Sequence, residues 1–151
     1  MRSVWTNTGL AGSRGFVTAS AYVDGGARGN PGPAGIGVVI NIDGETPIHH
    51  NSYIGEATNN VAEYSAIIAC LEKCLELGVS DVRIHGDSEL VVRQMTGRYR
   101  VKHPNLIPLH AQVSALAARL QTVEFIHVVR KKNVDADRLV NQAINQALSD
   151  R

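Results

Sequence analysis

The sequence has little net charge and no long apolar run. Its 15 Lys and Arg residues stand against 14 Asp and Glu, which gives a formal net charge of +1. This balance excludes a strong overall basic field, so any binding of nucleic acid must be local. No apolar run approaches the ~20 residues that span a bilayer, and the first residues lack the apolar core of a signal peptide. We therefore expect a cytoplasmic protein without a membrane segment.

Cysteine is scarce as well. Cys70 and Cys74 lie four residues apart in a predicted helix, a spacing that suits two buried, reduced thiols better than a disulfide that closes so short a loop. The six histidines are scattered, and no Cys/His spacing matches a zinc site. A structural zinc ion is therefore not expected.

The length of 151 residues and the hydrophobic fraction of 44% fit one domain with one core. Residues 1–16 show no sustained periodicity, which predicts a flexible N-terminal arm before a domain at 17–151. The chain has no obvious apolar heptad repeat. We therefore expect a monomer.

Hydrophobic periodicity predicts an α/β fold. Three strands are expected at 17–24, 35–42 and 46–55, and the Asp43-Gly44 pair between the last two is a strong hairpin signal. After them come a helix at 60–77, a strand at 82–86, a helix at 88–95, a polar link at 96–102, a helix at 106–120, a strand at 122–129 and a helix at 133–148. The pattern predicts a mixed five-stranded sheet, with three antiparallel and two parallel crossover strands, flanked by helices.

Asp24 ends the first of these strands and leads into a segment rich in Gly, Pro and Asn. Ala19, Ala21 and Val23 alternate with polar neighbours, so Asp24 is expected to point away from its apolar neighbours. The glycines that follow would let a bulky nucleic-acid backbone approach the turn. The alternative is that Asp24-Gly25 simply forms a hairpin turn.

Three further acidic residues, Glu63, Asp87 and Asp137, are placed where one edge of the sheet can gather them. Each also has a structural explanation. Glu63 could complete a capping box with Asn60, Asp87 could cap the helix that follows it, and Asp137 could interact with a helix dipole together with Asp135.

Four carboxylates brought together repel one another unless a multivalent cation lies between them. Oxygen ligands select a hard ion such as Mg²⁺, and two such ions about 3.5–4 Å apart can hold the attacking and leaving oxygens of a phosphodiester. The group therefore indicates hydrolytic nuclease chemistry.

The four acidic residues stand in ordered motifs: Asp24 in Asp-Gly-Gly-Ala-Arg-Gly-Asn-Pro-Gly-Pro-Ala-Gly, Glu63 in Thr-Asn-Asn-Val-Ala-Glu-Tyr, Asp87 in Gly-Asp-Ser-Glu-Leu-Val and Asp137 in Asn-Val-Asp-Ala-Asp-Arg-Leu-Val-Asn. This series resembles ribonuclease HI over residues 17–148. The resemblance implies the ribonuclease H-like fold and endonucleolytic cleavage of the RNA strand of an RNA/DNA hybrid. It also implies 5′-phosphate and 3′-hydroxyl products.

The resemblance further implies a role for each carboxylate. Asp24 would bridge two Mg²⁺ ions, Glu63 and Asp87 would bind one of them, and Asp137 would bind the other near the attacking water. Mn²⁺ is expected as a substitute. Asp135 is the alternative to Asp137, which fits the Ala-Asp-x-Leu pattern better.

Four polar residues match positions that contact the hybrid in this family. Asn30, Asn59 and Asn60 would lie near the cleavage site, and Thr58 would contact a phosphate of the DNA strand. Amides can recognise a 2′-hydroxyl because they both donate and accept hydrogen bonds. Helix capping is the alternative for Asn59 and Asn60.

The chain departs from the best-studied bacterial members at two places. The long basic helix that they carry is missing, and only residues 97–103 fill the gap, so fewer phosphate contacts are expected. As a hypothesis, Arg98 and Arg100, with Arg93 and Lys102, form a reduced basic patch in which Tyr99 packs on sugar or base. The alternative is a solvated link with ordinary surface cations.

The second departure is the loop after the last strand, where many members carry a mobile histidine. This chain has Val129-Arg130-Lys131-Lys132-Asn133 there. Arg130, or a neighbouring lysine, could act at that place by its charge. Alternation puts His127 on the strand itself, as a core or edge residue.

Two other functions remain open at this point. One is a module that binds hybrids without cleaving them, since domains can keep a fold and lose its chemistry. The other is a different nuclease or strand-transfer enzyme built on the same sheet. Acidic residues at all four positions argue against the first, and the Gly-Asn-Pro-Gly-Pro segment argues against the second.

Overall fold

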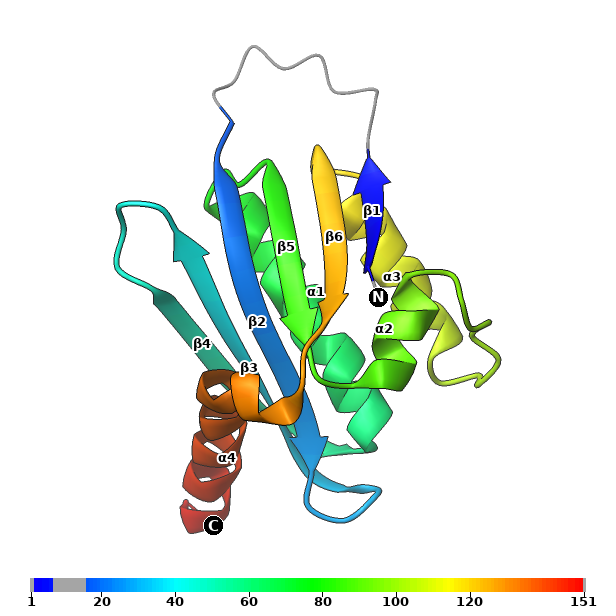
Figure 1. Cartoon of the computed structure of the whole chain (residues 1–151). Coiled ribbons are helices and arrows are strands. Elements are labelled where there is room, and N and C mark those ends of the chain that lie inside the picture. Colours follow the sequence, from blue (N-terminus) through cyan, green and yellow to red (C-terminus); the bar gives the residue numbers. More distant parts are fainter. Residues whose placement is uncertain (1, 7–15, 151) are drawn as a thin grey trace.

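A six-stranded mixed sheet forms the centre of the computed structural model, which describes residues 2–6 and 16–150 (Figure 1). The strand order across the sheet is β1-β6-β5-β2-β3-β4. The strands are β1 (Arg2–Thr6), β2 (Thr18–Ala27), β3 (Gly32–Ile42), β4 (Ile48–Ala57), β5 (Asp81–Gly86) and β6 (Thr122–His127).

Strands β2, β3 and β4 form the expected antiparallel meander, and β5 and β6 add to it in parallel with β2. Gly44 adopts a φ of +80° in the turn between β3 and β4, a conformation that the Asp-Gly hairpin signal anticipated. The predicted mixed sheet of three antiparallel and two parallel crossover strands is therefore confirmed.

The sixth strand, β1, was not expected. Arg2–Thr6 pairs antiparallel with β6, from Arg2 opposite Ile126 to Thr6 opposite Thr122. A segment of five residues is too short to show a periodicity of its own, and its extended backbone is instead stabilised by pairing with a strand far along the chain. Part of the predicted N-terminal arm is thus an edge strand, and residues 1 and 7–15 lie outside the described residues.

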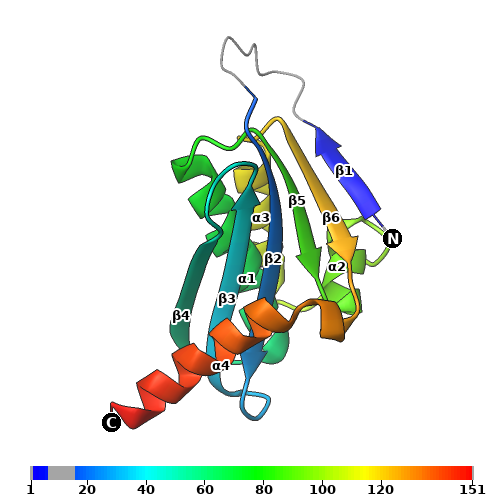
Figure 2. The ribbon, with the colours of Figure 1, turned by 60° about the vertical axis from the view of Figure 1, so that its left-hand side comes forward.

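Helices cover both faces of the sheet (Figure 2). They are α1 (Asn59–Glu76), α2 (Glu89–Met95), α3 (Ile107–Ala117) and α4 (Val134–Ser149), with a 3-10 turn, η1 (Arg130–Lys132), before the last. Helices α1, α2 and α3 lie on one face, whereas α4 crosses the other face over β3 and β4 (Figures 1 and 2). No described helix is both long and apolar enough to pass through a bilayer.

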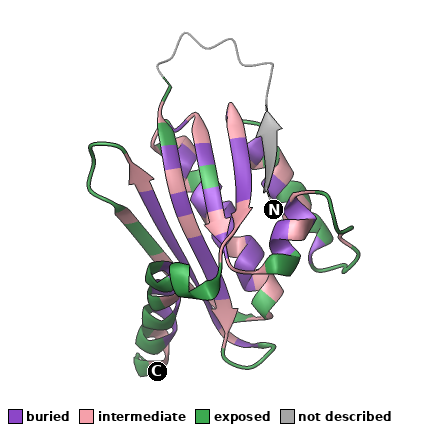
Figure 3. Cartoon of the chain, viewed as in Figure 1, coloured by how far each residue is buried: buried purple, intermediate pink, exposed green. Residues whose placement is uncertain are grey.

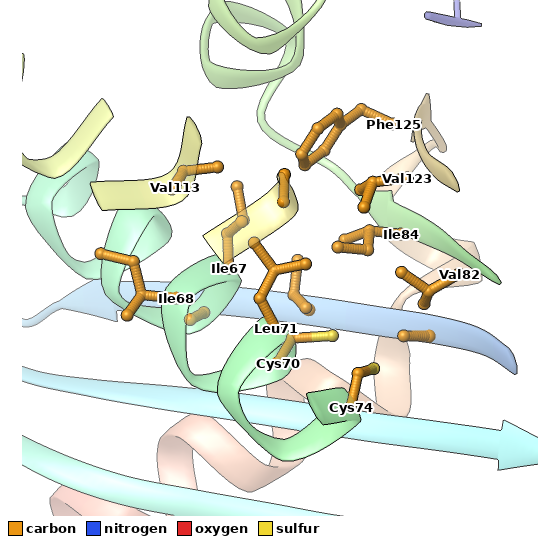
Figure 4. Packing of buried hydrophobic residues seen from close by; sticks show 14 of the residues in the cluster. Ile67, Ile68, Cys70, Leu71, Cys74, Val82, Ile84, Val113, Val123 and Phe125 are labelled. Atoms are coloured by element: carbon orange, nitrogen blue, oxygen red, sulfur yellow. The ribbon is translucent and has the colours of Figure 1, made fainter. Parts of the chain in front are cut away.

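The main core lies between the sheet and α1, as the buried segments in Figure 3 show. The alternation predicted for β2 is confirmed, because Ala19, Ala21 and Val23 are buried and contribute to this core. Cys70 and Cys74 are buried and free, as expected, and lie among aliphatic side chains of α1 and β5 (Figure 4).

Candidate active site

Three carboxylates meet at one end of the central strands. Asp24 lies in β2, Glu63 lies in the second turn of α1, and Asp87 directly follows β5; one oxygen of each lies within 4.8 Å of the other two. Asp137, in the first turn of α4, lines the same open groove, and its charge acts on Asp24. The structure thus brings together all four acidic residues singled out from the sequence.

Two glycines allow the helices to approach Asp24 closely. A Cβ atom on Gly25 would overlap the backbone carbonyl of Ala62 in α1, and a Cβ atom on Gly37 would overlap that of Ala136 in α4. Gly37 is also the residue paired with Asp24 across β2 and β3. The sequence predicts that the glycines after Asp24 admit nucleic acid, but Gly25 serves the packing of α1 against the sheet and lies within β2 rather than in a hairpin turn.

Hydrogen bonds at the helix starts exclude the capping explanations of Glu63 and Asp87. Thr58, not Asn60, is the N-cap of α1, and its Oγ1 accepts from the Val61 N–H at 3.2 Å. Ser88 caps α2 in the same way, so Asp87 is not used as a cap. Glu63 instead points to the sheet, where its Oε1 accepts from the Gly25 N–H at 3.3 Å.

Crowding and burial change the acidity of the cluster. Burial, together with the negative charges of Asp87 and Asp137, raises the pKa of Asp24 to about 7, although a hydrogen bond from Glu63 acts in the opposite direction. Burial and the charge of Asp24 raise the pKa of Glu63 well above its usual value. Asp24 and Glu63 therefore hold protons more strongly than usual, and a divalent cation would compete with those protons. The all-oxygen donor set of the cluster fits a hard ion such as Mg²⁺.

The two aspartates of α4 have different surroundings. Asp137 faces the groove, where Arg130 Nη2 lies 3.9 Å from its Oδ1. Asp135 is exposed and forms an ion pair of 3.2 Å with Arg138. Asp137 therefore lies with the other carboxylates, whereas the alternative residue Asp135 does not line that groove.

Asparagines form one rim of the groove. Asn30 Oδ1 accepts from the Asn59 N–H at 3.0 Å, and Asn59 Oδ1 accepts from the Ala27 N–H at 2.9 Å. These two bonds use the oxygens and leave both amide nitrogens as donors. Asn59 and Asn60 line the groove directly.

The basic link lies elsewhere on the surface. Arg98 and Arg100 are exposed and line a second groove beside α2 and α3, together with Tyr99. Arg93 pairs with Glu89, 2.6 Å distant, and its guanidinium carbon lies 5.2 Å from the centroid of the Tyr99 ring. Arg98 and Arg100 are therefore not brought into the carboxylate groove.

Sequence reasoning missed two side chains that support the carboxylate groove. Asn133 was taken only as the start of a helix, yet its Nδ2 donates to Asp87 Oδ2 at 3.0 Å. Arg28 Nη2 donates to Asn141 Oδ1 at 3.3 Å across the groove wall. Asn133 and Asn141 belong to the Asp137 motif and Arg28 belongs to the Asp24 motif, so these two motifs were the available signal.

Comparisons with known proteins agree with this geometry. Residues 22–143 match a family model described as reverse transcriptase-like. The chain is 47% identical over 126 residues to the bifunctional protein Rv2228c of Mycobacterium tuberculosis, covering 82% of this chain and 35% of that protein. It is 41% identical over 128 residues to ribonuclease HI of Halobacterium salinarum, covering 84% of this chain and 64% of that one. The chain thus spans about a third to two thirds of the length of these relatives.

Solved structures match nearly end to end. The N-terminal RNase H domain of Rv2228c aligns with a TM-score of 0.84 at 44% identity, covering 89% of this chain and 98% of that one. LC11-RNase H1, solved in complex with an RNA/DNA hybrid, aligns with a TM-score of 0.80 at 46% identity, covering 86% and 99%. By sequence and by fold, the chain belongs to the ribonuclease H family.

Proposed function

We propose that the chain is a metal-dependent endoribonuclease that hydrolyses the RNA strand of RNA/DNA hybrids and leaves 5′-phosphate and 3′-hydroxyl ends. The observation that supports this most directly is the convergence of Asp24, Glu63 and Asp87 within 4.8 Å in an open groove. A family member of similar fold, LC11-RNase H1, has been solved with such a hybrid.

Asp24 would help to hold both of two Mg²⁺ ions. Glu63 and Asp87 would hold one of them and Asp137 would hold the other, with Mn²⁺ as a substitute. When bound, these ions supply an activated water and stabilise the negative charge of the reacting phosphate. The protein fixes three of the carboxylates on a strand and two helices and the fourth, Asp87, directly after β5, so little rearrangement is needed when substrate arrives.

The rim residues would select and orient the hybrid. The free amide donors of Asn30 and Asn59, with Asn60, are suited to ribose 2′-hydroxyls, and Thr58 is suited to a phosphate of the DNA strand. Arg98 and Arg100 would contact phosphates farther along the duplex. Arg130, next to Asp137, would act at the cleavage site by its charge.

Cleavage assays test this function. We would incubate the full chain with labelled RNA/DNA hybrid, double-stranded RNA and double-stranded DNA, each with Mg²⁺, with Mn²⁺ and with a chelator. The proposal expects cleavage of the hybrid alone and only with metal. Binding of the hybrid without cleavage would instead favour the non-catalytic module, and equal cleavage of all three duplexes would reject the selectivity.

We further propose that the chain is a monomer and acts in the cytoplasm. Two free, buried cysteines suit a reducing compartment. Size-exclusion chromatography with light scattering tests the oligomeric state, and a mass near 16.3 kDa is expected.

A further inference from the structure

Asn133 lies between η1 and α4, and its side chain is turned away from the helix that it precedes. The residue occupies the N-cap position of α4, yet its side chain makes no capping hydrogen bond, and it is only 1% exposed. Asparagine at this position ordinarily caps the helix with its side-chain oxygen. The side chain of Asn133 is therefore used for contacts other than the capping of α4.

The amide group of Asn133 is fixed by two acceptors. Its Nδ2 donates to the Val23 carbonyl at 2.8 Å and to Asp87 Oδ2 at 3.0 Å. A reversed amide would place an oxygen against both acceptors, so the assignment of nitrogen and oxygen is determined. Asn133 Oδ1 is buried and has no partner in the described part of the chain. Leaving it unpaired is costly, which implies that the contacts of the nitrogen outweigh the loss.

Asn133 connects three parts of the carboxylate cluster. Its side chain bonds Asp87, its backbone carbonyl accepts from the Asp137 N–H at 3.1 Å, and its other acceptor, Val23, immediately precedes Asp24. These contacts join β2, the end of β5 and the first turn of α4 at one buried point. The pairing of β2 with β5 also ends here, at Val23 and Gly86.

The geometry points to Asn133 as a positioning residue that holds Asp87 toward Asp24 and ties the start of α4, the helix that carries Asp137, to β2. This role rests on the proposed function, because it concerns the same metal-dependent site. Since Asn133 bonds Asp87 Oδ2, the other oxygen of that carboxylate remains available for a cation. Asn133 thus acts on the ion only through its neighbours.

The matched test compares Asn133→Ala with Asn51→Ala. Asn51 also anchors α4 by an amide, since its Nδ2 donates to the Leu139 carbonyl at 2.9 Å, but it does not line the carboxylate groove. Both variants lose one asparagine that ties α4 to the sheet. Only the first loses a contact to a candidate ligand.

We would measure kcat and KM for the hybrid, and separately the rise in Tm that Mg²⁺ produces without substrate. For Asn133→Ala we expect kcat to fall about 10- to 100-fold, a range typical of residues that orient metal ligands, with little change in KM. The Mg²⁺-induced rise in Tm should shrink. Asn51→Ala should lower the starting Tm and keep both the kcat and the Mg²⁺ response.

Asn133→Ser guards against a variant that merely fails to fold. Its hydroxyl keeps a polar group at this buried position, but it is one bond shorter than the amide and does not extend to Asp87 as Nδ2 does, so the same loss of kcat is expected in a protein that its melting curve shows to be folded. Wild-type kcat and Mg²⁺ response in this variant, or equal losses in Asn51→Ala, would overturn the role of Asn133. If the wild-type chain cleaves no hybrid, the proposed function fails, and the melting comparison still decides whether Asn133 acts on the metal site.

Discussion

Gly25 lies so close to Ala62 that the backbones of β2 and α1 are in direct contact beside the carboxylate cluster. The Gly25 N–H also donates to Glu63, the residue after Ala62. One glycine without a side chain thus sets both the height of the helix above the sheet and the direction of its acidic side chain.

Gly25→Ala should therefore destabilise the protein. The added Cβ would overlap the Ala62 carbonyl, and overpacking of this kind typically costs about 1–3 kcal/mol in the free energy of unfolding. Urea denaturation measures the loss. Gly26→Ala is the matched control, because its Cβ would meet only Val140 Cγ1 at 3.8 Å, an ordinary contact. Equal stability losses in the two variants would contradict the proposed contact.

The stability of the metal-free protein should fall as the pH rises from about 4 to beyond 7. The folded state raises the pKa of Asp24 from 3.8 to about 7, so the folded chain binds more protons than the unfolded chain across this window. Raising the pH removes those protons and leaves buried, repelling charges. Melting curves between pH 4 and pH 8 without metal measure the trend.

Two additions sharpen this experiment. Asp24→Asn should flatten the decline and abolish turnover without unfolding the chain. Saturating Mg²⁺ should stabilise the wild-type protein more at pH 8 than at pH 5, since protons compete with the ion for the same oxygens. A fully active Asp24→Asn, or a Mg²⁺ effect that grows on acidification, would remove the basis of the proposed chemistry.

Asp137→Asn and Asp135→Asn should differ sharply in activity. Asp137 lines the groove beside Asp24, whereas Asp135 forms an exposed ion pair with Arg138. We expect kcat to fall by at least about tenfold for the first variant. The second should keep wild-type kcat and lose little stability, because exposed ion pairs contribute about 0–1 kcal/mol. Steady-state kinetics at saturating Mg²⁺ decides between them, and the reverse order would exchange their roles.

Charge reversal tests the basic link. If Arg98 and Arg100 contact phosphates, replacing each by Glu should raise KM for the hybrid and weaken binding further as salt increases, with kcat nearly unchanged. Arg119→Glu reverses an exposed charge near the far end of α3 and serves as the control. An unchanged KM in the Arg98 and Arg100 variants would show that the link is an ordinary solvated surface.

Local patterns in the sequence predicted most of the sheet. The alternation around Ala21 and the Asp43-Gly44 turn are properties of neighbouring residues, so they can be read without the fold. Strand β1 could not be predicted from the sequence, because its partner β6 lies more than a hundred residues away and five residues carry little signal of their own.

The candidate site could likewise be predicted from the sequence only in part. The four acidic residues were found because each stands in its own motif. The burial of Glu63 against Gly25 and the bond from Asn133 to Asp87 both depend on packing between distant segments. The choice of Thr58 rather than Asn60 as the cap is local, but both residue types are common N-caps, so the sequence alone did not decide between them. The motifs identify the acidic residues, and only the tertiary structure shows which contacts hold them in place.

The last of the four carboxylates is carried by α4, which follows every strand of the sheet in the chain. During synthesis on the ribosome, the growing polypeptide therefore lacks the full set of four candidate ligands until this helix has emerged and docked on the sheet. A folding intermediate in which α4 is not yet docked on the sheet would hold only three of the four candidate ligands together.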